Sequence, residues 1–222
     1  MKSLCSVFLI TGILISFRAY AVNDAVSIGP VPKFSKSSPA LHKSLVALRS
    51  QIESDARDCV ENAQGMESIG NYNATLSKTF EAKKVVGVEV TGTMICDGVH
   101  SSSYRYGVAF ETASGRRFDL NRIYNIAVRQ NGHLLLRPEL VQAVELSYRS
   151  ANANNPSCLA DADLDEQLTN FPLTFSPEPG GSIALYYAVA DLSAGCFPVL
   201  HLQRSAILPY RDGAQALRYG LP

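Results

Sequence analysis

Tryptophan is absent from the 222 residues, which removes one common side chain for stacking on carbohydrate, although ten tyrosines remain. The chain also lacks a run of basic residues and any pairing of aromatic side chains with clusters of lysine or arginine. The sequence therefore carries no signature of a nucleic-acid-binding protein. Charged residues make up only 18% of the chain and hydrophobic residues 46%, a composition typical of a globular domain and not of a disordered one.

The familiar patterns for catalysis and metal binding are missing too. There is no Gly-x-Ser-x-Gly elbow, and no Cys-x-x-Cys or His-x-x-x-His spacing that would indicate zinc. Asp161, Asp163, Asp165 and Glu166 resemble a calcium loop in spacing. The glycine and the distal glutamate that such a loop needs are not in place, which favours a solvated helix start. We expect no catalytic residue, no metal ion and no cofactor.

The N-terminal residues have the pattern of a secretory signal peptide. Lys2 gives a positive start, Leu4 to Phe17 is an apolar run, and Ala19-Tyr20-Ala21 is a small-x-small cleavage site. No later segment is apolar enough to span a membrane. We therefore expect a signal peptide over 1–21, a periplasmic or secreted mature protein, and no stable membrane anchor after cleavage.

The mature chain is expected to be near neutral and to form one domain. The whole chain has 20 basic and 20 acidic residues, and only two of the basic ones, Lys2 and Arg18, lie in the predicted signal peptide. A linker rich in proline and serine is expected over 22–37, a single α+β domain over 38–210, and a loose tail over 211–222. A chain of this length suffices for one hydrophobic core.

Four cysteines remain after the signal peptide: Cys59, Cys96, Cys158 and Cys196. An even number in an exported protein indicates two disulfides, for which three pairings exist. We favour Cys59–Cys96 and Cys158–Cys196, because each pair joins segments that a compact α+β domain would place side by side. A zinc site is the less favoured alternative.

A stretch of alternating residues, Val85 to Leu120, predicts a meander of three strands. Val86, Val88 and Val90 alternate with smaller or polar residues, which is typical of a half-buried strand. The turn Cys96 to His100 leads into a second alternating strand with Tyr104, Tyr106, Val108 and Phe110 on one face. A third strand is expected over Arg117 to Leu120.

Helices and further strands are expected before and after this meander in the sequence. Ser38-Pro39 is typical of a helix start, and apolar residues recur every three or four positions as far as Cys59. A second helix is expected to begin at Arg137-Pro138-Glu139. The last third is β again, and adjacent Tyr186 and Tyr187 should point to opposite faces of a strand. The predicted fold is an antiparallel sheet, with a meander and C-terminal hairpins, packed by two main helices.

The turn between the first two meander strands has three interpretations. The first is a hydrolase triad, because its three residue types occur here in Asp97, His100 and Ser101 to Ser103. However, the side chains of residues in one turn rarely come together in the geometry that a triad needs. The structural interpretation is that Asp97 caps the turn through its side chain and His100 bonds the neighbouring strand. The third is a loop that contacts a ligand.

Several short motifs occur in a fixed order between about Asn71 and Tyr210. They are Gly98-Val99-His100, the hairpin Phe110 to Leu120, Phe171 to Glu178, Leu185-Tyr186-Tyr187 and Leu208-Pro209-Tyr210. In this order they resemble the extracellular lysozyme-binding domain of certain bacterial anti-sigma factors, which also accompanies some peptidoglycan deacetylases. The chain departs from that family's pattern with Val99 where the family has alanine, with Phe-Glu-Thr at the hairpin start, and with its added cysteines.

The resemblance implies an α+β fold, a cell-envelope setting, and binding of a lysozyme-like muramidase or of peptidoglycan. Anti-sigma signalling is not carried over. The implied contact is the connection Cys96 to Ser103, with the candidate partner-binding residues Asp97, Gly98, His100, Ser101 and Tyr104. The leading hypothesis is a binding domain without catalysis, and the alternative is a peptidoglycan-acting envelope enzyme or its accessory module.

Overall fold

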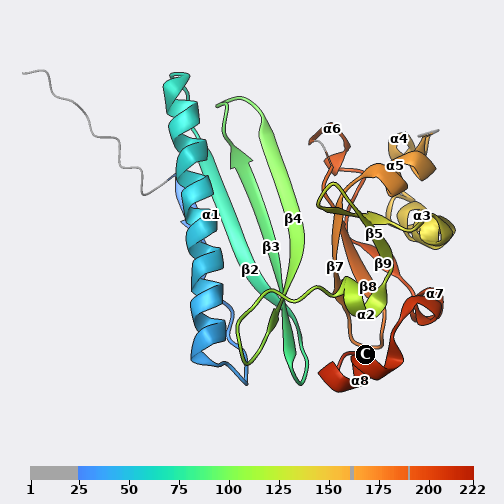
Figure 1. Cartoon of the computed structure of the whole chain (residues 1–222). Helices are drawn as coiled ribbons and strands as arrows, with labels where there is room; N and C mark the ends of the chain where they lie inside the picture. Colours follow the sequence, from blue (N-terminus) through green and yellow to red (C-terminus); the bar gives the residue numbers. More distant parts are fainter. Residues whose placement is uncertain (1–24, 161–162, 190) are drawn as a thin grey trace, which may run out of the picture.

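The computed structural model describes residues 25–160, 163–189 and 191–222. The predicted signal peptide lies outside these residues, and so does Asp161 of the acidic cluster. The protein has the predicted α+β fold, with antiparallel sheets and two disulfides. Figure 1 shows a long helix on one side of a four-stranded sheet and the C-terminal half, from residue 121 onward, on the other side.

The long helix α1 (Pro39–Gly65) follows the sequence pattern closely. The Ser38 hydroxyl accepts a hydrogen bond from the Leu41 amide, and Pro39 occupies the first helical position, as the N-cap pattern predicted. Its apolar face packs on the sheet through residues that recur every three or four positions: Leu41, Leu45, Leu48, Ile52, Ala56 and Cys59.

The four-stranded sheet has the order β1-β2-β3-β4, with β4 at one edge. Its strands are β1 (Val26–Ile28), β2 (Asn71–Glu81), β3 (Val85–Ile95) and β4 (Ser101–Glu111). β2, β3 and β4 are antiparallel, and β1 joins β2 in parallel. Val86, Val88 and Val90 are fully buried under α1, as their alternation predicted.

The opposite face of this sheet is divided into two parts. Near the turn between β2 and β3, small residues such as Gly87, Gly107 and Ala109 let the C-terminal half approach closely. A Cβ atom on Gly107 would lie 2.9 Å from the Tyr186 ring and 3.1 Å from the Phe175 carbonyl oxygen. Near the turn between β3 and β4 the same face carries hydroxyl and charged side chains and does not pack.

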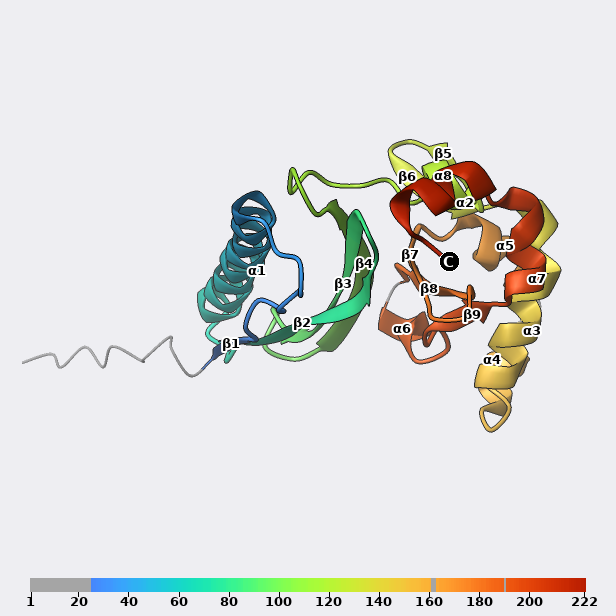
Figure 2. The ribbon, with the colours of Figure 1, turned by 90° about the horizontal axis from the view of Figure 1, so that it is seen from below.

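The C-terminal half has its own sheets and its own buried cluster. A two-stranded sheet joins β5 (Ala127–Gln130) to β6 (His133–Leu136). A three-stranded sheet has the order β7 (Leu173–Pro177), β8 (Ile183–Tyr187), β9 (Leu200–Leu202). The helices of this half are α2 (Asn121–Tyr124), η2 (Pro138–Leu140), α3 (Val141–Ala151), α4 (Pro156–Leu159), α5 (Leu164–Asn170), α6 (Asp191–Ala194), α7 (Arg204–Ile207), η3 (Leu208–Tyr210) and α8 (Gly213–Tyr219). In Figure 2, α3, α4, α5 and α7 lie away from β4, whereas α6 faces the four-stranded sheet.

The two disulfides have the pairing favoured from the sequence. Cys59–Cys96 ties α1 to the end of β3, and Cys158–Cys196 ties α4 to the loop after α6. Each closes a loop of similar length, with sequence separations of 37 and 38 residues. The zinc alternative for these cysteines is therefore wrong.

One expectation about strands is wrong. The third meander strand, Arg117 to Leu120, is reduced to one isolated bridge between Phe110 and Arg117, because the chain turns there toward the C-terminal half. Tyr186 and Tyr187 point to opposite faces of β8, as expected, and both are buried, at 5% and 6% exposure. The sheet that carries them is covered on both faces: Tyr187 faces the C-terminal core, and Tyr186 packs against Gly107 of β4.

The segments expected to be a linker and a loose tail take part in the fold. From residue 25 the linker segment supplies β1, and Phe34 is buried against α1. The tail forms α8, and Leu221 is only 4% exposed. Three-residue strands and single buried anchors are too short to produce a sequence period, which explains both errors.

Candidate functional site

The turn between β3 and β4 is organised by Asp97. One oxygen of its carboxylate accepts hydrogen bonds from the backbone amides of Val99, at 2.9 Å, and His100, at 2.8 Å. The other oxygen pairs with Nδ1 of the His100 ring. These hydrogen bonds hold the pKa of Asp97 well below its usual range, and the two from backbone amides have the largest effect. Asp97 is therefore the cap of the turn, as the structural interpretation predicted.

The structural interpretation also expected His100 to bond the neighbouring strand, and that part of it is wrong. Its ring turns back to Asp97, and 78% of its side-chain surface is exposed. A general base in a hydrolase needs a shielded, oriented site beside its nucleophile. The Asp97–His100 pair is exposed to solvent, and its hydrogen bonds hold the turn.

The turn packs against the loop that follows α1. Gly98 has a φ of +73°, and a Cβ atom there would lie 2.0 Å from the Ser68 side chain. Glu67 also adopts a left-handed φ of 57°, which is uncommon for a residue other than glycine. We call these two joined segments, 66–70 and 96–100, the tip. The Cys59–Cys96 disulfide joins the first residue of the 96–100 segment to α1 and so fixes the tip to this helix.

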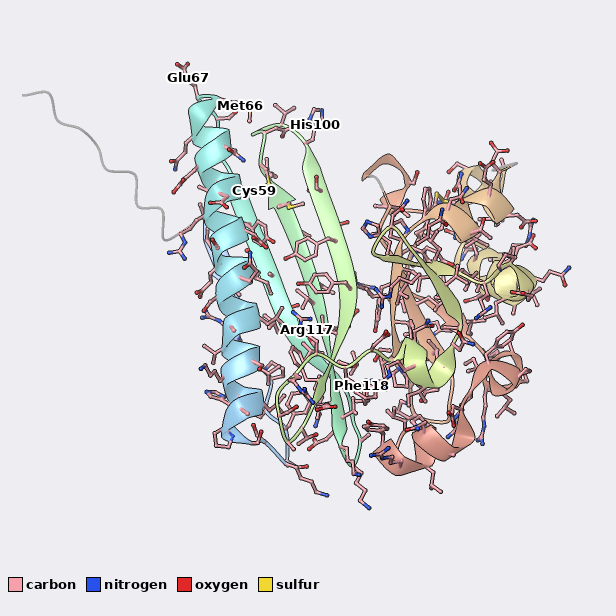
Figure 3. All side chains as sticks on the ribbon, in the orientation of Figure 1. Cys59, Met66, Glu67, His100, Arg117 and Phe118 are labelled. Carbon is pink, nitrogen blue, oxygen red and sulfur yellow. A yellow bond between two sulfur atoms is a disulfide. The ribbon has the colours of Figure 1, made fainter. Side chains whose placement is uncertain are left out.

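The tip exposes apolar side chains that the sequence analysis did not single out. Ile69 is 87% exposed, Val99 74% and Met66 55%. Figure 3 shows Met66, Glu67 and His100 at the same end of the molecule, above Cys59. Exposed apolar side chains gathered at one place are a mark of an interaction surface. The signal in the sequence was weak, because single apolar residues in a polar loop are common.

The helix surface next to the tip is acidic. Between 55 and 70 the acidic residues Asp55, Asp58, Glu61 and Glu67 are exposed, and they outnumber the one basic residue, Arg57. Asp97 adds a further carboxylate at the tip itself. The tip and the end of α1 therefore carry exposed apolar side chains next to several carboxylates.

The predicted site residues do not all lie together. Asp97, Gly98, His100 and Ser101 belong to the tip or to the first residue of β4. Tyr104 does not, because its ring lies over Gly92 on the α1 side of the sheet and its hydroxyl is hydrogen-bonded to that of Tyr72 at 2.7 Å. Burial raises the pKa of Tyr104 well above its usual range. Tyr104 is a half-buried packing residue and lies outside the exposed surface of the tip.

A cleft of about 660 Å³ separates the unpacked part of the sheet from the C-terminal half. Its sheet wall carries Thr91, Thr93 and Ser103, and its opposite wall carries Val189 and Val199. Period-two alternation in β3 and β4 places these hydroxyl side chains on one face, so the sequence pattern could predict that face. The sequence pattern could not predict that this face lies opposite the C-terminal half.

Arg105 and Tyr186 lie at the base of the cleft and also line a smaller hollow of about 290 Å³ beside β6. Nε of Arg105 lies 3.2 Å from a carboxylate oxygen of Glu89 on the neighbouring strand. Burial raises the pKa of Tyr186 above its usual range, and the charge of Glu89 acts in the same direction. Arg105 therefore adds a charged group to the hydroxyl groups of the sheet wall.

Residues 25–160, 163–189 and 191–222 contain no group of three or more histidine, cysteine or acidic side chains placed to hold a metal ion. Asp163, Asp165 and Glu166 lie at the start of α5, the helix start that the sequence favoured over a calcium loop. Within the same residues, no helix has both the length and the apolar character that crossing a membrane requires.

Comparison with known proteins gives a structural likeness and no match in sequence. No family model and no curated protein sequence matches the chain. Among solved structures, a DUF3298 family protein from Pseudomonas aeruginosa PAO1 is similar, with a TM-score of 0.44 and 14% sequence identity. The match covers 65% of this chain and 63% of that chain. A likeness of this size supports no conclusion about activity or partners.

Proposed function

We propose that this chain is a binding module of the bacterial cell envelope that catalyses nothing and binds a basic, lysozyme-like muramidase through its tip. The observation that carries the proposal is the group of exposed apolar side chains, Met66, Ile69 and Val99, fixed by a disulfide and adjacent to the carboxylates at the end of α1. Central apolar anchors within a polar rim are typical of protein–protein interfaces.

Charge complementarity supports a basic partner. The acidic residues near the tip create a negative field, which speeds association with a positively charged surface and disfavours acidic proteins. The choice of a muramidase rests on the family resemblance of the turn and hairpin motifs. A periplasmic or secreted location rests on the predicted signal peptide, and the two disulfides agree with an oxidising compartment.

The test is calorimetric titration of the oxidised mature protein with a basic lysozyme, at low and at moderate salt. We expect a one-to-one complex tighter than about 1 μM, roughly −8 kcal/mol, that weakens as salt screens the charges. The variant Ile69→Asp/Val99→Asp should weaken binding at least tenfold. Leu146→Asp, at a residue 72% exposed on α3, is the matched control and should bind as the wild type does.

Three results would overturn the proposal. The first is the absence of measurable heat with every lysozyme of a panel, and the second is binding unchanged by the double substitution at the tip. The third is turnover of purified cell-wall material that is lost on His100→Ala. That outcome would favour the alternative of a peptidoglycan-acting enzyme, with the exposed Asp97–His100 pair in a catalytic role.

A further inference from the structure

The sheet wall of the cleft is an ordered array of uncharged polar side chains. The register of the sheet places Asn73, Thr93 and Ser103 in one row across β2, β3 and β4. Thr75 and Thr91 stand in the next row, two residues along the same strands. Neighbouring strands lie about 4.8 Å apart, and successive residues on one face about 7 Å apart, so the array covers about 10 Å by 7 Å.

The polar groups of this array are accessible to a ligand. Asn73, Thr75, Thr93 and Ser103 are all exposed. Among the residues that the structure describes, the hydroxyl groups of Thr93 and Ser103 have no hydrogen-bond partner. The hydroxyl groups of Thr75 and Thr91 bond each other at 2.7 Å, so one of the two still has its proton to donate. Because a hydroxyl group both donates and accepts, the sheet wall offers both kinds of hydrogen bond.

The wall opposite the sheet is aliphatic where solvent reaches it. It includes Val189, Ala194 and Val199, each of which is partly exposed. Tyr187 and Phe197 line the same wall, but they are buried, at 6% and 8% exposure. The cleft therefore has hydrogen-bonding side chains on one wall and aliphatic side chains on the other. Its volume of about 660 Å³ is within the usual range of ligand sites, roughly 300–1,000 Å³.

This lining disfavours several classes of ligand. None of the described residues that line the cleft is acidic, and the Arg105 guanidinium is already paired with Glu89, so neither a cation nor an anion finds a free partner of opposite charge. A purely apolar ligand would remove water from the hydroxyl groups without replacing its hydrogen bonds, which is unfavourable. An extended peptide is recognised mainly through backbone hydrogen bonds, and the ladders with β2 and β4 already use those of β3.

We propose that this cleft binds an uncharged oligosaccharide. A sugar ring presents hydroxyl groups at its edge and C–H groups on its faces, and it therefore matches a cleft with one hydrogen-bonding wall and one aliphatic wall. The hydroxyl groups of the sugar replace the water that the side chains of the sheet wall lose on binding. The polar array is wider than one ring, which favours a chain of sugars over a monosaccharide. The site is separate from the tip, and the proposal does not rest on muramidase binding.

The experiment titrates the oxidised, isotope-labelled protein with two uncharged oligosaccharides and follows the NMR shifts of its backbone amides. The probes are the tetramer of N-acetylglucosamine and cellotetraose, which differ in their acetamido groups and so distinguish two classes of sugar. The variant Thr93→Val/Ser103→Ala removes both unpartnered hydroxyl groups with residues that a strand tolerates. Ser77→Ala is the matched control, because Ser77 is exposed on the same face of β2 and does not line the cleft.

At least one tetramer should shift the amide signals of Thr93, Ser103 and Val199 and leave that of Val99 at the tip unchanged. Because the aromatic rings of the opposite wall are buried and cannot stack on sugar, we expect a dissociation constant of about 1 mM, roughly −4 kcal/mol. The double substitution should weaken binding at least fivefold, and Ser77→Ala less than twofold. Unchanged spectra with both tetramers, shifts confined to residues outside the cleft, or equal effects of the variant and the control would overturn the proposal.

Discussion

At the scale of single residues, Asp97 shows how one carboxylate shapes the tip. Its carboxylate lies on the surface of the molecule, accepts hydrogen bonds from two backbone amides and pairs with the His100 ring. The same bonds that lower its pKa give the folded state a preference for the charged carboxylate. The stability of the turn that exposes Val99 to solvent therefore depends on pH.

Replacing Asp97 by asparagine should change the pH dependence of unfolding. The folded-state pKa is lower than the unfolded value of about 3.9, so the carboxylate stabilises the protein above that value. The contribution is lost as pH falls through the folded pKa. Asp97→Asn should lower Tm at pH 7, and its difference from the wild type should shrink toward pH 2. Thermal scans with Asp58→Asn, an exposed acid on α1, provide the control, and a difference independent of pH would contradict the prediction.

At the scale of elements, the Cys59–Cys96 disulfide joins the last turns of α1 to the end of β3. Both loops of the tip begin within a few residues of this link. The exposed apolar side chains are therefore held on a covalently fixed base, which lowers the entropy that binding must overcome.

The variant Cys59→Ala/Cys96→Ala should be less stable by about 4 kcal/mol, the chain-entropy value for a loop of this length. Urea unfolding monitored by circular dichroism measures the loss. Cys158→Ala/Cys196→Ala should show a similar loss, because its loop is nearly as long. Only the first variant should also weaken binding at the tip, and equal effects of both on binding would argue against a role of the tip.

At the scale of the whole molecule, the C-terminus completes the core of the C-terminal half. The Pro222 carbonyl accepts hydrogen bonds from the Tyr124 hydroxyl at 3.0 Å and from Nε of Arg211 at 2.8 Å. Burial raises the pKa of Tyr124 to about 12. Leu221 packs in the same cluster as β7 and β8. The last residues therefore stabilise the half that forms the far wall of the cleft.

Leu221→Ala should destabilise the protein by about 3 kcal/mol, the usual cost of removing a buried leucine side chain. Leu217→Ala, at a residue 80% exposed on α8, is the control and should change stability by less than about 0.5 kcal/mol. Urea midpoints compare the two variants. An unchanged midpoint for Leu221→Ala would restore the sequence-based expectation of a loose tail.

The sequence by itself determined the elements with a clear period or a clear boundary residue. The N-cap Ser38 and the apolar spacing of α1 predicted that helix, and the alternation of Val86 to Val90 predicted β3 and its buried face. The disulfide pairing followed from which of these elements lie side by side. These features depend on neighbours within a few residues or on one packing contact, so local pattern suffices to predict them.

Only the tertiary structure determined how the tip and the cleft form and how the end segments of the chain pack. The tip joins Ile69 and Val99 from two loops, and neither loop has a period that relates it to the other. The cleft exists because Gly107 admits Tyr186 at one end of the sheet face, while the part of the face that carries Thr93 and Ser103 stays apart from the C-terminal half. Such features depend on contacts between distant segments, which a local sequence pattern cannot encode.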